Sequence, residues 1–306
     1  MKKQIILLSV LFIFAQVPLG LWAEDAGRDV VELKVMSFNI WGGGGKSIEE
    51  TARVIKETSV DIAGIQESTK KGNNTAEKIA KDMGWHSHIT NPSCTIISRY
   101  PIVKISENRK GCKIQIGENR FVWMFNIHLM YCPYEPYQLN GIPYCGAPLL
   151  NTAEEAIASA WKTRGKEVET TIADIKEAQK DNCPIFLTGD FNEPSCLDWT
   201  DKAAKAGICK TPVKWTATKA FMEKADLKDS YRIKYPDEVA QKGHTWTTLP
   251  AKREVLDRID FVFFHGAKIE VNNVQIVGEK SNLTDIGFEN YPSDHRAVLG
   301  TFRLKF

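Results

Sequence analysis

Residues 184–192 read PIFLTGDFN, a short apolar run that leads through a glycine into two polar residues. An apolar run of this length, bounded by turn residues, is typical of a buried β-strand. Taken alone, Asp190 after Gly189 could form an Asx turn and have no further role. The stretch becomes informative because the same arrangement recurs along the chain.

Polar side chains of similar chemistry stand at or near the ends of several predicted strands. These carboxylate, carboxamide and imidazole residues are, in chain order, Asn39, Glu67, His128, Asp190, Asn192, Asp260, Asp294 and His295. Each could be explained separately, as turn chemistry, a cap or a hydrogen-bonded core histidine. Six clusters at strand ends are harder to explain as accidents, because strand ends in layered α/β proteins converge on one rim where ligand sites form.

The chain alternates between strand and helix patterns. Apolar runs predict strands at 30–40, 60–66, 95–98, 112–116, 121–129, 184–187, 258–264, 271–277 and 297–304. Helices are predicted at 47–57, 75–82 and 152–179, the last with five large apolar residues on one face, namely Ile157, Trp161, Val168, Ile172 and Ile175. Interleaved helices with hairpin-like strands favour a mixed-sheet α/β sandwich. With no repeat or linker, residues 24–306 are predicted to form a single domain.

The first residues have the pattern of an export signal. Lys2 and Lys3 precede an apolar run from Ile5 to Trp22, and the small residue Ala23 follows. We interpret residues 1–23 as a secretory signal peptide, which places the protein in the periplasm or outside the cell. A membrane anchor is the alternative, since the run approaches the length of a short spanning helix. No later segment is apolar enough to span a bilayer.

The net charge of the chain indicates whether a nucleic acid is an expected binding partner. The whole chain has 40 basic and 38 acidic residues, and Lys2 and Lys3 are the only charged residues of the signal, so the mature chain has no formal net charge. Proteins that hold nucleic acid through its phosphates usually carry a basic excess. Charge therefore gives no support for a stable nucleic-acid partner, and we expect a monomer that acts on a phosphoester substrate of unknown class.

Export makes disulfides plausible, and the seven cysteines leave at least one thiol unpaired within the chain. Spacing does not determine the connectivity. Pairing of near neighbours predicts Cys94–Cys112, Cys132–Cys145 and Cys196–Cys209, with Cys183 free. No cysteine has zinc-finger spacing.

The series SFNIW, GIQES, SRYPI, NIHL, GDFN, RIDFVFF and SDHRAV resembles the endonuclease/exonuclease/phosphatase superfamily, whose fold is deoxyribonuclease I-like. The motifs follow the order of that family and cover essentially all of residues 30–306. The residues EPSCLDWT after GDFN are similar to those of exported bacterial members. The resemblance implies a four-layered α/β sandwich with two packed mixed β-sheets, and an enzyme that hydrolyses phosphoester bonds with a divalent metal.

The resemblance also implies roles for the oxygen-bearing residues. Glu67 would be the main ligand of Mg²⁺ or Mn²⁺, with Asn39 and Asp294 completing or supporting the site. Oxygen ligands of this kind suit a hard, partly hydrated cation. Asp190, with Asn192 beside it, would orient and deprotonate the attacking water.

The histidines would act on the phosphate. His295 would contact the scissile phosphate, held in its tautomer by Asp260, and His128 would stabilise the developing charge from the other side. Arg258 and Arg296 flank these motifs, and we expect both to form structural ion pairs.

The natural substrate is left open among nucleic acid, a sphingolipid or phospholipid head-group, an inositol phosphate and a phosphomonoester, with a phosphodiester favoured. A non-catalytic binding protein on the same fold is the alternative from another class. It is disfavoured because no expected catalytic residue has been lost.

The segment after His128, LMYCPYEPYQLNGIPYCG, holds four of the eight tyrosines of the chain. It is predicted to be an irregular loop at the rim of the site, too rich in proline for an inner strand. Its rings could simply pack on the protein body. The alternative is a substrate-recognition loop in which Tyr131, Tyr134 and Tyr137 bind the substrate and a Cys132–Cys145 disulfide stiffens the segment.

Overall fold

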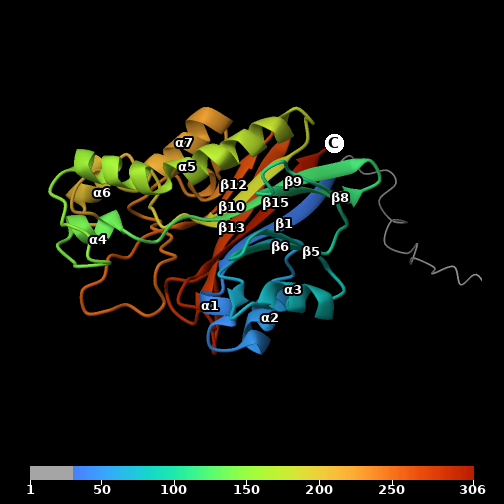
Figure 1. Cartoon of the computed structure of the whole chain (residues 1–306), viewed down its shortest axis with the longest axis horizontal. Helices are drawn as coiled ribbons and strands as arrows, with labels where there is room; N and C mark the ends of the chain where they lie inside the picture. Colours follow the sequence, from blue (N-terminus) through green and yellow to red (C-terminus); the bar gives the residue numbers. More distant parts are fainter. Residues whose placement is uncertain (1–29) are drawn as a thin grey trace, which may run out of the picture.

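The computed structural model describes residues 30–306, so the predicted signal peptide at residues 1–23 lies outside the described residues. Two β-sheets pack face to face, and helices cover the outer face of each (Figure 1). The predicted four-layered α/β sandwich with two mixed sheets is confirmed. No helix between residues 30 and 306 has the length and hydropathy that crossing a bilayer requires.

The first sheet has seven strands in the order β14-β13-β15-β1-β2-β6-β5. It is mixed, because β1 pairs parallel with β2 and antiparallel with β15. The strands are β1 (Val30–Asn39), β2 (Ile62–Gln66), β5 (His86–Asn91), β6 (Cys94–Ser98), β13 (Ile269–Glu279), β14 (Ile286–Phe288) and β15 (Ala297–Lys305). A small hairpin of β3 (Thr69–Lys70) and β4 (Asn73–Asn74) follows β2.

The second sheet has six strands in the order β11-β12-β10-β9-β8-β7. Here β10 pairs parallel with β9 and antiparallel with β12. The strands are β7 (Ile102–Ile105), β8 (Gly111–Gly117), β9 (Arg120–His128), β10 (Ile185–Asp190), β11 (Lys228–Asp229) and β12 (Asp260–His265). All nine predicted strands are present, whereas the mostly short strands β3, β4, β5, β7, β11 and β14 were not predicted.

Local capping explains where the helices begin. The Ser47 hydroxyl accepts a hydrogen bond from the Glu50 amide at 3.1 Å and starts α2 (Ile48–Glu57). Thr152 and Glu155 form a capping box that starts the long α5 (Ala153–Gln179). The other helices are α1 (Trp41–Gly44), α3 (Thr75–Asp82), α4 (Glu135–Leu139), α6 (Asp201–Lys205), α7 (Thr216–Ala225) and α8 (Ser230–Lys234).

Each layer boundary has its own apolar core. One core joins the two sheets, a second joins the second sheet to α5 and α7, and a third joins the first sheet to α2 and α3. The predicted apolar face of α5 contributes Val168, Ile172 and Ile175 to the second core. Burial of these faces is the main favourable term that holds the four layers together.

At one end of the interface between the sheets, the packing becomes polar. Gln66 donates to Asn126 at 2.6 Å, and the Gly189 amide donates to the Ser37 hydroxyl at 3.0 Å. A Cβ on Gly64 would lie 1.9 Å from the hydroxyl oxygen of Thr188, so this close approach of the sheets requires a glycine. The polar side chains lie directly behind the candidate site.

Two of the three predicted disulfides are wrong. Cys132 and Cys145 are bonded, whereas the other five cysteines are free thiols. Cys94 and Cys112 belong to strands of different sheets, which nearness in sequence could not reveal. Cys196 instead lies against the sulfur of Met222, at 3.9 Å.

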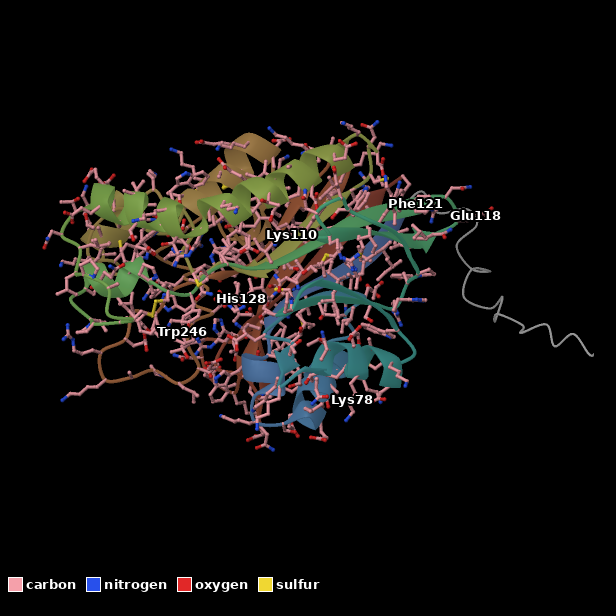
Figure 2. The ribbon with its side chains drawn as sticks, in the orientation of Figure 1. Lys78, Lys110, Glu118, Phe121, His128 and Trp246 are labelled. Atoms are coloured by element: carbon pink, nitrogen blue, oxygen red, sulfur yellow. A yellow bond between two sulfur atoms is a disulfide. The ribbon has the colours of Figure 1, made fainter. Side chains whose placement is uncertain are left out.

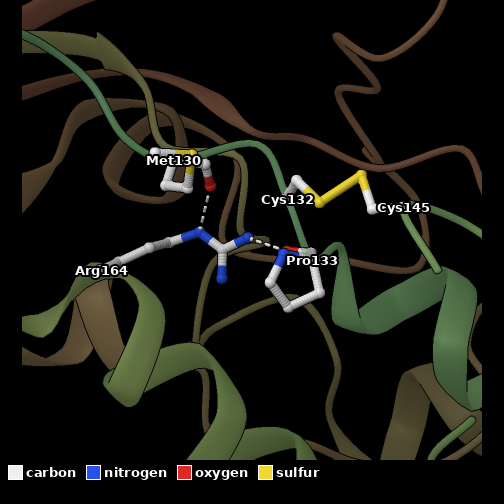
Figure 3. Close-up of a disulfide and its surroundings, with 5 residues drawn as sticks. All are labelled: Met130, Cys132, Pro133, Cys145 and Arg164. Carbon is white, nitrogen blue, oxygen red and sulfur yellow. Dashed lines mark hydrogen bonds between the residues drawn. A yellow bond between two sulfur atoms is a disulfide. The ribbon is translucent and has the colours of Figure 1, made fainter. Parts of the chain in front are cut away.

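The segment after His128 is more regular than predicted. Residues Glu135–Leu139 form α4, with a proline in its first turn, where a missing amide hydrogen is tolerated. Arg164 of α5 fixes the start of the segment by donating to the carbonyl oxygens of Met130 and Pro133, at 2.9 and 2.7 Å, beside the disulfide (Figure 3). The segment is therefore held at both ends.

Candidate active site

Strand register brings three predicted site residues into one row. In the second sheet, Asp190 of β10 lies opposite His128 of β9 on one side and Asp260 of β12 on the other. Because facing residues of neighbouring strands point to the same face, the three side chains lie next to one another. Figure 2 shows His128 and Trp246 at the end of the sheets opposite Glu118 and Phe121, so the row lies at one rim of the sandwich.

Glu67 reaches this rim from the first sheet. It directly follows β2 and has a positive φ of 51°, which is unusual for a residue with a side chain. The glycine-rich turn of α1 wraps around it: the Gly42 amide donates to its carboxylate at 2.6 Å, and the Gly43 amide donates to its carbonyl at 2.7 Å. Gly43 has a φ of 81°, and a Cβ there would lie 2.4 Å from the Cβ of Lys70. The turn thus requires glycine and fixes Glu67.

Asn39 joins the two sheets at the site. Its amide nitrogen donates to Glu67 at 3.2 Å and to Asp190 at 2.9 Å. Its side-chain oxygen accepts from the Trp41 amide at 3.0 Å. Asn39 therefore presents its NH₂ group to the carboxylates and holds them in place, rather than offering its oxygen to a cation.

His295 forms a buried pair with Asp260. Its Nδ1 lies 2.9 Å from the Asp260 carboxylate, its Nε2 lies 3.7 Å from Asp190, and the Trp246 ring packs against it with centroids 4.8 Å apart. Burial lowers the pKa of His295, but the negative charges of Asp260 and Asp190 outweigh it and raise that pKa to about 10. Burial raises the pKa of Asp260, and the His295 charge opposes that rise. The pair therefore holds a proton at neutral pH, and we place it on His295.

His128 and Asn192 flank Asp190. The Nε2 of His128 lies 3.4 Å from the Asp190 carboxylate, and its Nδ1 lies 3.2 Å from the Ser93 hydroxyl. Asn192 donates its backbone amide to Asp190 at 2.9 Å and its side-chain amide to the Leu129 carbonyl at 3.1 Å. Asn192 thus fixes the turn that orients Asp190.

Some carboxylate oxygens of the site have no partner among the described residues. Asp294 Oδ1 and Asp260 Oδ1 are both buried and accept no hydrogen bond from residues 30–306. Burial raises the pKa of Asp294 to about 6, and Glu67 adds to the rise while His295 opposes it. A divalent cation between Glu67 and Asp294 would relieve this repulsion, so these two residues fit a hard metal ion.

A second group of potential ligands lies beside them. One ligand atom each from Asp190, Asp260 and His295 lies within 4.8 Å of the others. A protonated His295 has no free lone pair on either ring nitrogen for an ion. The oxygens of Glu67 and Asp294 are therefore the candidate ligands of a cation.

One cavity of about 220 Å³ is lined by Glu67, His128, Asp190, Asp294 and His295, whereas Asp260 is not among its lining residues. Its lining, as far as residues 30–306 are concerned, includes three carboxylates and two imidazoles but no lysine or arginine. Six aromatic side chains make up most of the remaining wall: Trp41, Tyr131, Tyr134, Tyr137, Tyr144 and Trp246. Inside this wall, charge on a phosphate could be met only by the imidazoles and a bound cation.

The tyrosines of the predicted recognition loop divide into two groups. Tyr134 and Tyr137 are buried, and their hydroxyls donate to Asp257 at 2.7 Å and to Glu254 at 2.5 Å. Their rings pack edge to face, with centroids 4.8 Å apart. Tyr131 is exposed. The packing alternative thus describes Tyr134 and Tyr137, although both still line the cavity.

Arg258 and Arg296, the arginines near the motifs, form ion pairs outside the cavity. Arg258 donates to Asp198 and Asp229, and Arg296 donates to Glu279. Neither lines the cavity. This agrees with the structural role that was predicted for them.

Sequence reasoning missed Trp246, which packs on His295, and Ser93, which contacts His128. Neither residue belongs to one of the sequence motifs, so there was no reason in the sequence to assign it to the site. Trp41 belongs to the SFNIW motif but was not assigned a role. Its position next to Asn39 was the available signal.

Comparison with known proteins identifies the family of the chain. The sequence pattern of the Endonuclease/Exonuclease/phosphatase family matches residues 36–295. The uncharacterized protein F14F9.5 of Caenorhabditis elegans is 27% identical over 297 residues, which cover 88% of this chain and 91% of that protein.

Solved structures share the fold at low identity. TDP2 of D. rerio, complexed with a single-strand DNA product, has a TM-score of 0.55 at 16% identity and covers 89% of this chain and 98% of its own. A family protein of Bacteroides thetaiotaomicron has a TM-score of 0.54 at 15% identity, with coverages of 90% and 99%. An AP endonuclease of Archaeoglobus fulgidus has a TM-score of 0.53 at 14% identity, with coverages of 88% and 99%. At these identities the likeness concerns the fold.

Proposed function

The chain belongs to the endonuclease/exonuclease/phosphatase family, and from this premise we propose that it is a metal-dependent phosphoester hydrolase that acts on phosphodiesters. The observation that carries the proposal is the charge of the cavity. Three carboxylates and two imidazoles face one space, one of these carboxylates (Asp294) has an unpartnered oxygen, and among residues 30–306 no lysine or arginine lines the space. Such a site binds a phosphoester only together with a cation.

Glu67 and Asp294 would hold Mg²⁺ or Mn²⁺. The bound ion supplies charge neutralisation at the phosphoryl oxygens and lowers the pKa of a coordinated water. Asn39 fixes the distance between Glu67 and Asp190 through its two donated hydrogen bonds. The ion-binding oxygens and the base are thereby kept in one geometry.

Asp190 is the proposed general base. Its carboxylate is held by the Asn39 side chain at 2.9 Å and by the Asn192 amide at 2.9 Å. A carboxylate fixed in this way can accept a proton from a water that attacks phosphorus from the opposite side to the leaving alkoxide. The proton of the water passes to Asp190 as the new P–O bond forms and the ester bond breaks.

The imidazoles are the proposed phosphate contacts. His295 donates its Nδ1–H to Asp260 at 2.9 Å, which leaves Nε2–H free to donate to a phosphoryl oxygen. His128 lies on the other side of Asp190, at 3.4 Å, and faces the same space. Two donors placed in advance stabilise the charge of the transition state.

Export is part of the same proposal. It rests on the signal-like residues 1–23 and is supported by the Cys132–Cys145 disulfide, since such bonds persist in oxidising compartments. Residues 24–306 would then act as one domain, and as a monomer.

Hydrolysis of two chromogenic esters tests the function. Bis-p-nitrophenyl phosphate reports diesterase activity and p-nitrophenyl phosphate reports monoesterase activity, each measured with Mg²⁺, with Mn²⁺ and with EDTA. We expect metal-dependent cleavage of the diester, and its loss in Asp190→Asn. Asp237→Asn is the matched control, because Asp237 is exposed and pairs with Lys202 on the surface.

Full activity in excess EDTA after dialysis would contradict the metal. A folded protein that is inert toward both esters with either metal would favour the non-catalytic binding protein. Faster cleavage of the monoester would assign a phosphatase instead.

A further inference from the structure

The cavity wall suggests what lies next to the phosphate in the substrate. Apart from the groups that would meet one phosphate and its cation, the wall is almost entirely aromatic. A second or third phosphate on the substrate would find no cationic side chain among the described lining residues. The wall therefore disfavours a polyphosphorylated head-group and favours an uncharged one.

Two of the aromatic rings are exposed to solvent although the backbone that carries them is fixed. Trp41 has 37% of its surface exposed and Tyr131 has 53%, and both line the cavity. Large aromatic surface left in water is unfavourable and often marks a binding site.

The two rings come from different sheets. Trp41 follows β1, and its backbone is held by the Asn39 side chain and by the Gly45 amide, at 3.0 and 2.6 Å. Tyr131 follows β9 in the second sheet, between Met130, whose carbonyl accepts from the buried Arg164, and the disulfide-bonded Cys132. A ligand in the cavity would meet one ring from each sheet.

Tyr134 and Tyr137 do not share this freedom, and the Tyr144 ring packs edge to face against that of Tyr137, with centroids 5.4 Å apart. The hydroxyls of Tyr134 and Tyr137 donate to carboxylates, and their rings are buried. No hydrogen bond between residues 30 and 306 involves the side chain of Trp41 or Tyr131, so both rings can pack on a ligand without losing a partner. Holding the rings in place beforehand reduces the entropy lost on binding.

We propose that Trp41 and Tyr131 form an aromatic clamp that selects phosphoesters bearing a flat, uncharged aromatic group next to the phosphate. The inference rests on the proposed function, because it names the substrate class of the same site. The Trp41 and Tyr131 rings stack on that group, while the imidazoles and the metal oxygens meet the single phosphate. The clamp sets affinity and takes no part in bond breaking.

Two phosphonates test the clamp without turnover, because their C–P bond is not hydrolysed. Calorimetry with the full protein and Mg²⁺ compares phenylphosphonate with methylphosphonate. We expect phenylphosphonate to bind about tenfold more tightly, since a stacked ring contributes about that factor or more. Trp41→Ala and Tyr131→Ala should each reduce the preference to below about threefold, whereas Trp41→Phe and Tyr131→Phe should retain it.

Phe121→Ala is the matched control, because it removes an aromatic ring at the far end of β9, away from the cavity (Figure 2). It should leave the preference unchanged. Equal binding of the two phosphonates by the wild-type protein, or a preference that survives both alanine variants, would overturn the clamp. Tighter binding of phosphocholine than of phenylphosphonate would also overturn it, in favour of a cationic group.

The same measurements separate this inference from the proposed function. A phenyl preference that is lost in the alanine variants of a protein unable to cleave bis-p-nitrophenyl phosphate would keep the clamp and reject the hydrolase. Cleavage of the diester without a phenyl preference would keep the hydrolase and reject the clamp.

Discussion

Two regions of this molecule hold buried or partly buried acidic side chains in opposite surroundings. In the first region, the arginine cluster, Arg258 donates to Asp198 and Asp229 at 2.8–3.0 Å, and Arg232 donates to Asp198 at 2.7 Å. Each acid faces at least one guanidinium. The Arg258 guanidinium also lies over the Phe261 ring, 4.8 Å from its centroid.

In the second region, the cavity of the candidate active site, the acids outnumber the bases. Asp190, Asp260 and Asp294 share His295, and oxygens of Asp260 and Asp294 have no partner among residues 30–306. Arg258 and Asp260 are only two residues apart in the chain, yet they belong to different regions. Pairing by arginine makes a buried acid structural, whereas unpaired acid oxygens leave a site for a cation and a substrate.

The largest expected effect tests this difference in the cavity. Asp190→Asn removes the proposed base. Asn39 and Asn192 donate to different oxygens of Asp190, so the asparagine oxygen keeps one of these bonds and its NH₂ group faces the other donor. We expect kcat for bis-p-nitrophenyl phosphate to fall about a thousandfold, whereas the free energy of unfolding should fall by only about 1 kcal/mol. Kinetics and urea denaturation measure the two quantities. A kcat within tenfold of wild type would remove Asp190 from the mechanism.

The same substitution in the arginine cluster should act on stability instead. Asp229→Asn keeps an oxygen for the amides of Tyr231 and Arg232, but it leaves Arg258 short of one acceptor. We expect the free energy of unfolding to fall by about 3 kcal/mol, with kcat of the folded fraction almost unchanged. A loss below about 1 kcal/mol would mean that Asp198 alone satisfies Arg258.

The third prediction is that stability depends on Mg²⁺ through the cavity and not through the arginine cluster. Mg²⁺ at a hundred times its dissociation constant should raise the free energy of unfolding by about 2.7 kcal/mol, because only the folded chain presents Glu67 together with Asp294. EDTA should abolish the gain. Thermal denaturation measures this stabilisation by Mg²⁺. Glu67→Gln should not be stabilised by Mg²⁺, whereas Asp229→Asn should be stabilised as much as the wild type. An equal gain in Glu67→Gln would place the ion elsewhere.

Asp257 is an intermediate case and should show the smallest effect. It is buried and accepts from Tyr134 and Trp199, at 2.7 and 2.8 Å, but no guanidinium of the described residues forms an ion pair with it. Burial raises its pKa to about 7, so the folded chain binds this proton more tightly than the unfolded chain, whose aspartates have a pKa of about 4. The contribution of Asp257 to stability is therefore most favourable below about pH 4 and declines as the pH rises to about 7.

We expect this decline to amount to about 2.6 kcal/mol between pH 5 and pH 8. Urea denaturation across that range measures it as the difference between the wild type and Asp257→Asn, whose side chain does not titrate. Parallel pH profiles for the two proteins would show that Asp257 is already ionised in the folded chain at pH 5.

Much of the fold follows from local patterns. Every predicted strand is present because an apolar run of that length can be buried only between or against layers. Two predicted helix starts are correct because Ser47 and Thr152 make their capping bonds within three residues. The short edge strands β7 and β11 escaped prediction because their pairing depends on distant neighbours rather than on their own composition.

The site residues were predicted from their types and places near strand ends, but their mutual arrangement was not. His128, Asp190 and Asp260 are separated by more than sixty residues each, and only the register of β9, β10 and β12 aligns them. The same holds for Trp246 against His295 and for the buried hydroxyls of Tyr134 and Tyr137. Contacts between residues far apart in the chain produce no periodic pattern in the sequence, so they could not be predicted from it.

The sequence by itself thus determined the family, the layered α/β architecture and the inventory of acids, amides and imidazoles at the strand ends. Those features depend on residue type and on spacing along the chain. Tertiary structure alone decided that only one of the three predicted cysteine pairs, Cys132–Cys145, forms, that Asn39 presents its NH₂ group to Glu67 and Asp190, and which buried acids are neutralised by arginine. The reason is physical: hydrogen bonds and ion pairs act over a few ångströms, and only folding brings residues far apart in the chain within that distance.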